Sequence, residues 1–107
     1  MWISIAVIQL YFNDVENMNK RRSRLDIIAD MLTSIQDKGG KIKPTHLMYK
    51  ANLSHNLLQS YLEELIHKNM VKEMDINNYK YLIITDKGLE LIQNLKKMKD
   101  FQDSFGI

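Results

Sequence analysis

The spacing of apolar residues changes along this chain, and that change limits the folds open to it. Between Lys20 and Lys68 most apolar residues recur every three or four positions, as they do on one face of an α-helix. From Met70 to Ile84 the sequence forms two short runs that suit β-strands, and helical spacing returns after Thr85. We therefore expect a mainly helical protein with one small β-hairpin before its last helix.

The first half of the chain predicts three helices. The first covers about Lys20 to Asp37 and ends at Gly39-Gly40, because glycine adopts the left-handed conformation that closes helices. A short strand, Lys41–Lys43, precedes a helix over Pro44–Lys50, since the missing N–H of proline is harmless in a first helical turn. After a tight turn, Ser54 is a suitable N-cap for a third helix that runs to about Lys68.

The second half predicts a hairpin and a final helix. Asn69 closes the third helix, since asparagine tolerates the left-handed region. The turn residues Asp75–Asn78 separate two strands, Met70–Met74 and Tyr79–Ile84, and Thr85 caps the last helix. Two helices joined by a short turn and followed by a hairpin form a winged helix-turn-helix. The expected fold class is mainly α with a small β-hairpin (α+β).

Charge is unevenly distributed along the sequence. The chain has 15 basic and 13 acidic residues, a formal net charge of +2. The segment Lys20–Lys50 nevertheless holds eight basic residues against three acidic ones. Such a cluster is suited to contact phosphates, because lysine and arginine release counterions from a nucleic-acid backbone. The alternative is the solvated surface of a mildly basic protein.

A family resemblance rests on Tyr49–Val71, YKANLSHNLLQSYLEELIHKNMV, with GGKIKPTHLM before it and YLIITDKGLELI after it. These motifs resemble the archaeal winged helix-turn-helix family of predicted transcriptional regulators. They are also similar to the small archaeal ten-kilodalton chromatin-associated DNA-binding proteins. The likeness covers about Lys20–Phe101, and it departs from the family at Asn69, where glycine is usual, and in the leader Met1–Asn17, which has no counterpart.

The resemblance implies binding of double-stranded DNA without a cofactor or catalysis, and a homodimer formed through an antiparallel coiled coil of the last helices. The predicted seam consists of apolar residues at heptad spacing: Leu91, Leu95, Met98 and Phe105. The alternative is that this seam packs on its own domain. The last helix ends soon after Phe105, so the coiled coil would be short.

The predicted DNA contacts fall into three groups. The third helix, about 54–68, would enter the major groove with polar residues at its start: Ser54, His55, Asn56, Gln59 and Ser60. Phosphate contacts are expected near the starts and ends of the first two helices, at Arg21, Arg22, Arg24, Lys43, Thr45 and Lys50. The wing tip would add Asn77 and Asn78. The third helix has no arginine, which favours low sequence specificity, and its polar residues have the alternative role of a solvated face.

The leader is treated separately. Trp2–Phe12 is largely apolar but too short for a membrane span, which needs about 20 residues. It also lacks the basic start and cleavage site of a signal peptide. We therefore divide the chain into an apolar leader (1–17), peripheral or an artefact of a true start at Met18, a winged helix-turn-helix domain (18–86) and a coiled-coil-like helix (87–107).

The residues that usually carry catalysis or metal binding are sparse. The chain has no cysteine, its three histidines are not spaced as a ligand set, and Gly39-Gly40 lacks the P-loop pattern. We expect no enzyme activity, no metal and no cofactor. The sequence predicts a cytoplasmic, nucleoid-associated DNA-binding protein that acts as a transcriptional regulator or chromatin-architectural protein. The alternative is a winged-helix module that binds another protein without contacting DNA directly.

Overall fold

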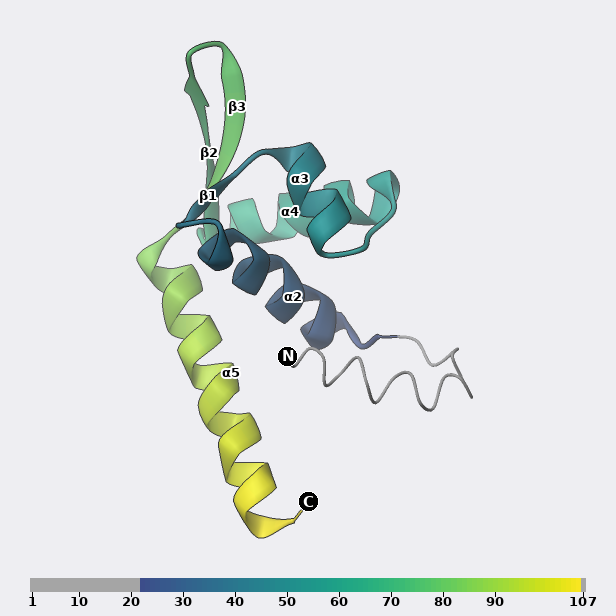
Figure 1. Ribbon diagram of the computed structural model, residues 1–107, viewed down its shortest axis with the longest axis vertical. Helices are drawn as coiled ribbons and strands as arrows, with labels where there is room; N and C mark the ends of the chain where they lie inside the picture. Colours follow the sequence, from purple (N-terminus) through teal and green to yellow (C-terminus); the bar gives the residue numbers. More distant parts are fainter. Residues whose placement is uncertain (1–21, 107) are drawn as a thin grey trace. The chain divides into compact units, whose positions relative to one another are not determined.

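The computed structural model describes residues 22–106, so the apolar leader and Arg21 lie outside the described residues (Figure 1). Its elements are α2 (Arg24–Asp37), β1 (Lys41–Ile42), α3 (Pro44–Lys50), α4 (His55–His67), β2 (Val71–Ile76), β3 (Tyr79–Ile84) and α5 (Asp86–Phe105). The chain divides within α2 into two compact units, Met1–Asp30 and Met31–Ile107. Within the described range, no helix is both long and apolar enough to cross a membrane.

The ends of α2 follow from local hydrogen bonds. The Asp26 N–H donates to the Ser23 hydroxyl at 3.0 Å, and the Ser23 N–H donates to the Asp26 carboxylate at 3.1 Å. This reciprocal cap starts the helix at Arg24, later than the predicted start at Lys20. The predicted end is confirmed: Gly39 and Gly40 have φ of 82° and 91°.

The helix-turn-helix is formed by α3 and α4 as predicted. Asn52, with φ of 55°, turns the chain between the two helices. The Ser54 hydroxyl then accepts a hydrogen bond from the Leu57 N–H at 3.2 Å and caps α4. At the other end Asn69 has φ of 63°, and the Met70 N–H donates to the Leu65 carbonyl at 2.9 Å. Asparagine therefore performs the helix-closing role usual for glycine.

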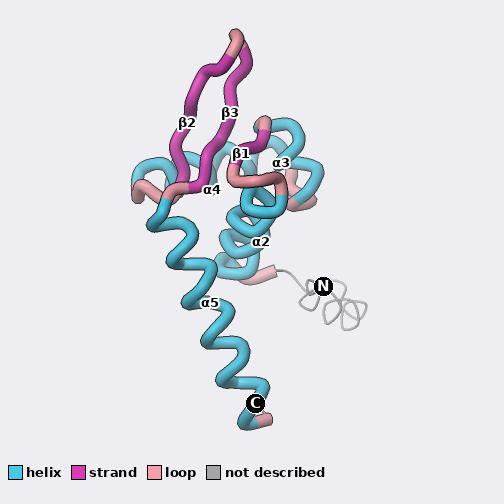
Figure 2. Tube along the Cα trace, turned by 60° about the vertical axis from the view of Figure 1, so that its left-hand side comes forward, coloured by secondary structure: helices cyan, strands magenta, loops and turns pink. Residues whose placement is uncertain are grey.

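The three strands form an antiparallel sheet in the order β1-β3-β2 (Figure 2). The hairpin turn is tighter than predicted, because Asp75 and Ile76 continue β2 and only Asn77-Asn78 forms the loop. These two asparagines have φ of 52° and 70°, the pattern of a type I′ turn. Such a turn matches the natural twist of paired strands, so the ladder extends to the pair Ile76 and Tyr79.

The core of the second unit is formed by the apolar faces of its helices and one face of the sheet. Its largest fully buried side chains are Met31, Leu32, Ile35, Ile42, Leu47, Leu58, Leu65, Leu82 and Val71. The spacing of Leu57 along α4 matches that of the buried leucines, but its side chain is 43% exposed. The buried stripe of α4 is therefore narrower than the sequence indicates.

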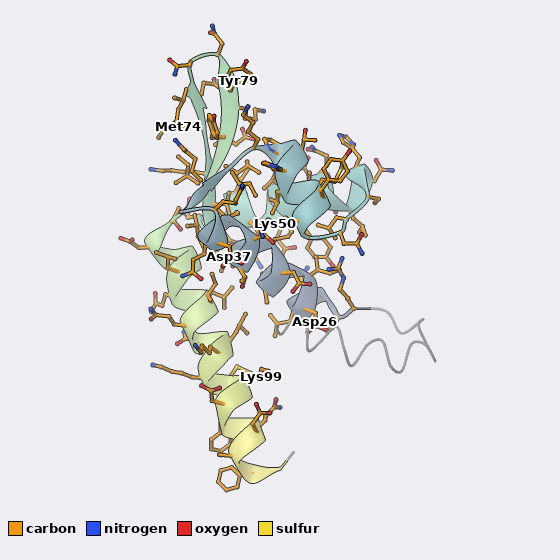
Figure 3. The ribbon with its side chains drawn as sticks, in the orientation of Figure 1. Asp26, Asp37, Lys50, Met74, Tyr79 and Lys99 are labelled. Carbon is orange, nitrogen blue, oxygen red and sulfur yellow. The ribbon has the colours of Figure 1, made fainter. Side chains whose placement is uncertain are left out.

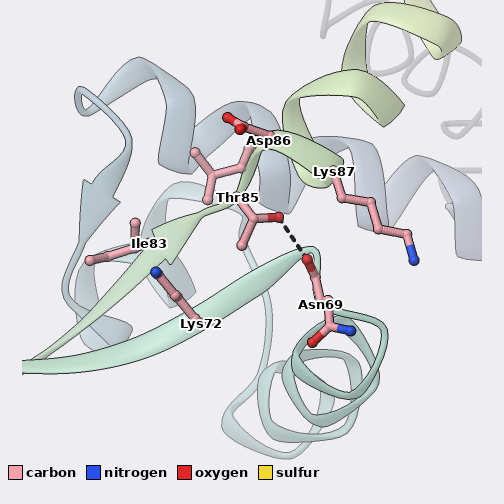
Figure 4. A pocket seen from close by; sticks show the side chains of 7 residues that line it. Asn69, Lys72, Ile83, Thr85, Asp86 and Lys87 are labelled. Atoms are coloured by element: carbon pink, nitrogen blue, oxygen red, sulfur yellow. Dashed lines mark hydrogen bonds between the residues drawn. The ribbon is translucent and has the colours of Figure 1, made fainter.

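The start of α5 is fastened to the base of the hairpin. The Thr85 hydroxyl accepts from the Gly88 N–H at 3.2 Å and donates to the Asn69 carbonyl at 2.7 Å (Figure 4). Gly88 is buried so closely that an added Cβ would lie 2.5 Å from the Met70 carbonyl oxygen and 2.8 Å from Ile84 Cγ1. From this point α5 leads away from the hairpin (Figure 1).

This close approach makes Gly88→Ala destabilising. Alanine would add about 1 kcal/mol of helix propensity, but overpacking against a backbone carbonyl costs about 1–3 kcal/mol. We expect a net fall in the urea midpoint of unfolding. The control is Gln93→Ala, at an exposed position of the same helix, which should leave the midpoint unchanged or raise it. A Gly88→Ala protein as stable as the wild type would contradict the close contact of Gly88 with Met70 and Ile84.

Candidate nucleic-acid interface

Helix α4 has one buried face and one exposed polar face. Leu58, Leu62 and Leu65 are buried. The exposed side chains at the start of the helix include four of the predicted base contacts: His55, Asn56, Gln59 and Ser60. Ser54 is also exposed, but its hydroxyl already accepts the capping hydrogen bond. Leu57 adds an apolar side chain at the start of α4 that the sequence analysis did not assign to the site, because its spacing matches the core.

The predicted phosphate contacts near α3 are all exposed: Lys43, Thr45 and Lys50. Lys43 is the N-cap residue of α3 but makes no capping hydrogen bond with its side chain. Its ammonium instead lies over the ring of Tyr79, 4.1 Å from the centroid. Lys50 lies in the last turn of the helix. The two lysines therefore flank α3, and Lys43 faces the hairpin.

Of the predicted arginines, the structure describes Arg22 and Arg24, which belong to the first unit. Arg21 is outside the described residues, and Arg24 is the exposed first residue of α2. Arg22 precedes the helix and donates a hydrogen bond to the Asp30 carboxylate at 2.8 Å. Burial raises the pKa of Asp30, and the hydrogen bond from Arg22 opposes that rise. The charge of Arg22 is thus partly compensated within its own unit.

The wing is the hairpin formed by β2 and β3, and its charged side chains are divided between its two faces. The sequence gives it equal numbers of acidic and basic residues, Lys72 and Lys80 against Glu73 and Asp75. In the register of the sheet, Lys72 lies on one face, whereas the other three lie on the opposite face, where Lys80 pairs with Glu73 at 3.6 Å. The sequence signal for this separation is the alternation of side chains along each strand.

At the tip of the wing, Asn77 and Asn78 are exposed. Both have positive φ, so the turn itself requires residues that tolerate this conformation. At the base of the wing, an open depression of about 470 Å³ is lined by Asn69, Lys72, Ile83, Ile84, Thr85, Asp86 and Lys87 (Figure 4). The depression presents two lysines and one carboxylate.

Helix α5 leaves an apolar stripe uncovered. Met98, Phe101 and Phe105 are exposed, whereas Leu91 and Leu95 are half-buried. Helical spacing alone places Phe101 on the neighbouring stripe of Leu89 and Ile92, but its ring lies 4.8 Å from that of Phe105. Phe101 therefore joins the stripe that contains the predicted seam. A depression of about 410 Å³ beside it is lined by Lys97, Met98, Phe101 and Gln102.

The other predicted features are quickly placed. His46, His55 and His67 are exposed on α3 and α4. Among residues 22–106, no group of three or more histidine, aspartate or glutamate side chains is placed to hold a metal ion. The described part of the chain therefore offers polar and basic surfaces as its candidate sites.

Comparisons with known proteins agree with this architecture. Sso10a-2, a DNA-binding protein from Sulfolobus solfataricus, is 23% identical with a TM-score of 0.67, over 78% of this chain and 85% of its own. A winged-helix DNA-binding protein from STIV is 18% identical with a TM-score of 0.64, over 77% of this chain and 92% of its own. A MarR family protein from Bacillus stearothermophilus is 14% identical with a TM-score of 0.62, over 96% of this chain and 74% of its own.

At these identities the solved structures establish the fold. No curated protein matches the sequence significantly. A family model described as winged helix-turn-helix matches residues 21–103, which is most of the chain. This match confirms the resemblance found from the sequence, and the chain belongs to the winged helix-turn-helix family.

Proposed function

We propose that this protein binds double-stranded DNA and acts as a transcriptional regulator or chromatin-architectural protein. The observation that carries the proposal is the exposed polar start of α4, which follows α3 as the second helix of a helix-turn-helix. In this motif the second helix enters the major groove and its first residues contact base edges. Two of the similar solved structures are described as DNA-binding proteins, which supports the same role here.

The exposed residues of α4 suggest how bases are contacted. Asn56 and Gln59 carry amides that can pair with adenine, and His55 and Ser60 can reach a base edge or a phosphate. The exposed Leu57 is suited to contact a thymine methyl group. Because α4 contains no arginine, bidentate contacts to guanine are absent from this helix, and sequence preference should be modest.

Phosphates would be held mainly by residues outside α4. Lys43, Thr45 and Lys50 are exposed on and beside α3, and Arg24 is exposed at the start of α2. We propose that Arg21 and Arg22 also contact phosphates. Arg22 would then either bind a phosphate together with Asp30 or give up its hydrogen bond to Asp30. The wing tip, Asn77-Asn78, would contact the adjacent minor groove.

We further propose that residues 18–86 form the DNA-binding domain and that residues 87–107 dimerise it. The exposed stripe of Met98, Phe101 and Phe105, continued by Leu95, would be covered by the same helix of a second copy. Such a homodimer presents two copies of α4 to one duplex. We expect the protein to be cytoplasmic and nucleoid-associated, and to act without catalysis, metal or cofactor.

The DNA-binding proposal predicts a strong dependence on salt. With about 4–6 phosphates neutralised per bound subunit, log K against log salt should have a slope of about −4 to −5. The measurement is fluorescence anisotropy of a labelled duplex over a salt series. Absence of duplex binding at low salt would reject the proposal and favour the protein-interaction module.

If α4 contacts the bases, the double variant Asn56→Ala, Gln59→Ala should lose sequence preference without losing most of its affinity for DNA. Each lost amide contact should cost about 1–3 kcal/mol at its preferred base, so sequence preference should fall more than non-specific affinity. The preferred sequence would first be selected from a random duplex pool. The control is Gln36→Ala with Gln93→Ala, which removes two exposed amides from other helices. An unchanged preference would move sequence recognition away from α4.

The dimer proposal predicts that a charge in the stripe gives monomers. Leu95→Asp and, separately, Met98→Asp should each halve the molecular mass measured by light scattering, because a carboxylate would be buried in the seam. Gln93→Asp places the same charge on another face of α5 and should leave the dimer intact. Variants with the same mass as a dimeric wild type would place the dimer contact elsewhere.

A further inference from the structure

We propose that the solvent-facing side of the three-stranded sheet is a second nucleic-acid site, which binds single strands by stacking bases on Tyr79 and Tyr81. This outer face of the sheet consists of Lys41, Lys72, Met74, Ile76, Tyr79, Tyr81 and Ile83, with Lys43 at its edge. The inference goes beyond duplex binding through α4, because it uses a different form of nucleic acid and shares only Lys43 with the proposed duplex contacts.

Strand register assembles this face. Side chains along β3 alternate, so Leu82 and Ile84 are buried in the core while Tyr79, Tyr81 and Ile83 point to the other side. Residues paired across the sheet share a face: Lys41 and Lys72 flank Ile83, and Met74 lies beside Tyr81. Tyr79 is 57% exposed and Met74, on the neighbouring strand, is also exposed (Figure 3), while Tyr81 is half-buried.

The charges that the strands and Lys43 bring to the outer face are all positive, and an acidic residue, Asp86, lies beside Lys72 and Ile83 in the depression at its base. Lys41, Lys43 and Lys72 are all exposed, and no residue that the strands place on this face is acidic. The acidic residues of the hairpin, Glu73 and Asp75, lie on the opposite face. A surface with three ammonium groups and two phenol rings is complementary to a flexible polyanion that carries planar bases.

The lysines already lie against the rings. The Lys43 ammonium is 4.1 Å from the centroid of Tyr79 and 5.9 Å from that of Tyr81, and the Lys41 ammonium is 4.9 Å from that of Tyr81. An exposed cation–π contact is weak, whereas stacking of a base on an aromatic ring is stronger. A bound strand could therefore exchange the ammonium for a base over each ring, while the displaced lysine pairs with a nearby phosphate.

The geometry favours an unpaired strand over a duplex. Tyr79 and Tyr81 are two residues apart on one strand, about 7 Å, which allows two successive unstacked bases to lie on separate rings. The bases of a duplex are stacked on each other and present only their edges, so they cannot cover these rings. The two tyrosines should therefore favour single strands over a duplex, whereas the lysines should contribute affinity for both.

The experiment measures anisotropy of labelled oligo(dT) and oligo(U) of about 10 nucleotides, and of a duplex, with the full chain. Tyr79→Ala combined with Tyr81→Ala should weaken single-strand binding roughly tenfold per ring and change duplex affinity much less. Tyr79→Phe with Tyr81→Phe keeps both rings and should retain binding. Tyr49→Ala removes a tyrosine that is 73% exposed and belongs to α3 instead of the sheet, and this variant should also bind normally.

Two further measurements are the effect of removing Lys41 and Lys72 on the salt dependence, and the relative affinities for oligo(U) and oligo(dT). Lys41→Gln with Lys72→Gln should reduce the magnitude of the single-strand salt slope by about 1.4, since each phosphate contact contributes about 0.7. Tighter binding of oligo(U) would identify RNA as the natural ligand, and tighter binding of oligo(dT) would identify single-stranded DNA. Either preference supports the proposal when it depends on the tyrosine rings.

Several outcomes would overturn the proposal. One is failure of both oligonucleotides to bind at low salt, and another is equal binding by the alanine and wild-type proteins. A third is loss of single-strand binding in the variant with alanine at Asn56 and Gln59, because α4 would then carry both activities. Failure of duplex binding alone would reject the function proposed for α4 and leave this site standing. Urea unfolding of each variant checks that a loss of binding is not a loss of fold.

Discussion

Strand β3 contributes alternate side chains to the core of the second unit and to its outer face. It is paired with β2 along its whole length and with β1 at Leu82 and Ile83, so its backbone has little freedom to shift at its C-terminal end. One side of β3 supplies Leu82 and Ile84 to the core, and the other side presents Tyr79 and Tyr81. The same alternation that buries Leu82 turns Tyr79 and the half-buried Tyr81 to the other side, and the packing of the core therefore fixes the chemistry of the outer face.

The base of the hairpin also determines the path of α5. Thr85 links the end of β3 to the Asn69 carbonyl, and Gly88 lets the helix approach the Met70 carbonyl. Helix α5 thus begins at a fixed point in the domain and continues beyond it with an uncovered apolar stripe. The stripe is separated from the exposed polar start of α4 along the chain, so the proposed dimer contacts and the proposed duplex contacts to bases use different elements.

Local chemistry made most of the fold predictable. Gly39-Gly40, Asn69 and the caps at Ser54 and Thr85 each work through neighbouring residues, and each ends or begins an element where the sequence indicated. The start of α2 was misplaced because Arg22, before Ser23, is as compatible with a helix as Arg24, after it. The hairpin turn was misplaced because Asp75 and Ile76 can occupy either a turn or a strand, and strand pairing decides between them.

The candidate sites were less predictable because they depend on which side chains share a surface. The exposed residues of α4 could be proposed from one helix, whereas the outer face combines Lys41 and Lys43 with tyrosines almost 40 residues later. Only the register of β1 on β3 brings them together. Similarly, the ion pair of Arg22 with Asp30 and the exposure of Leu57 are properties of packing that spacing alone does not reveal.

The alternation along β3 also restricts how this hairpin can vary in length. In a regular ladder, one residue added between Tyr81 and Leu82 would move both rings to the face of Glu73, while two added residues would return them. Related chains that keep the outer face should therefore have insertions or deletions of an even number of residues in the part of each strand between the turn and the pair of Glu73 and Leu82. Insertions of odd length are compatible with the outer face only at the tip, beyond Ile76 and Tyr79.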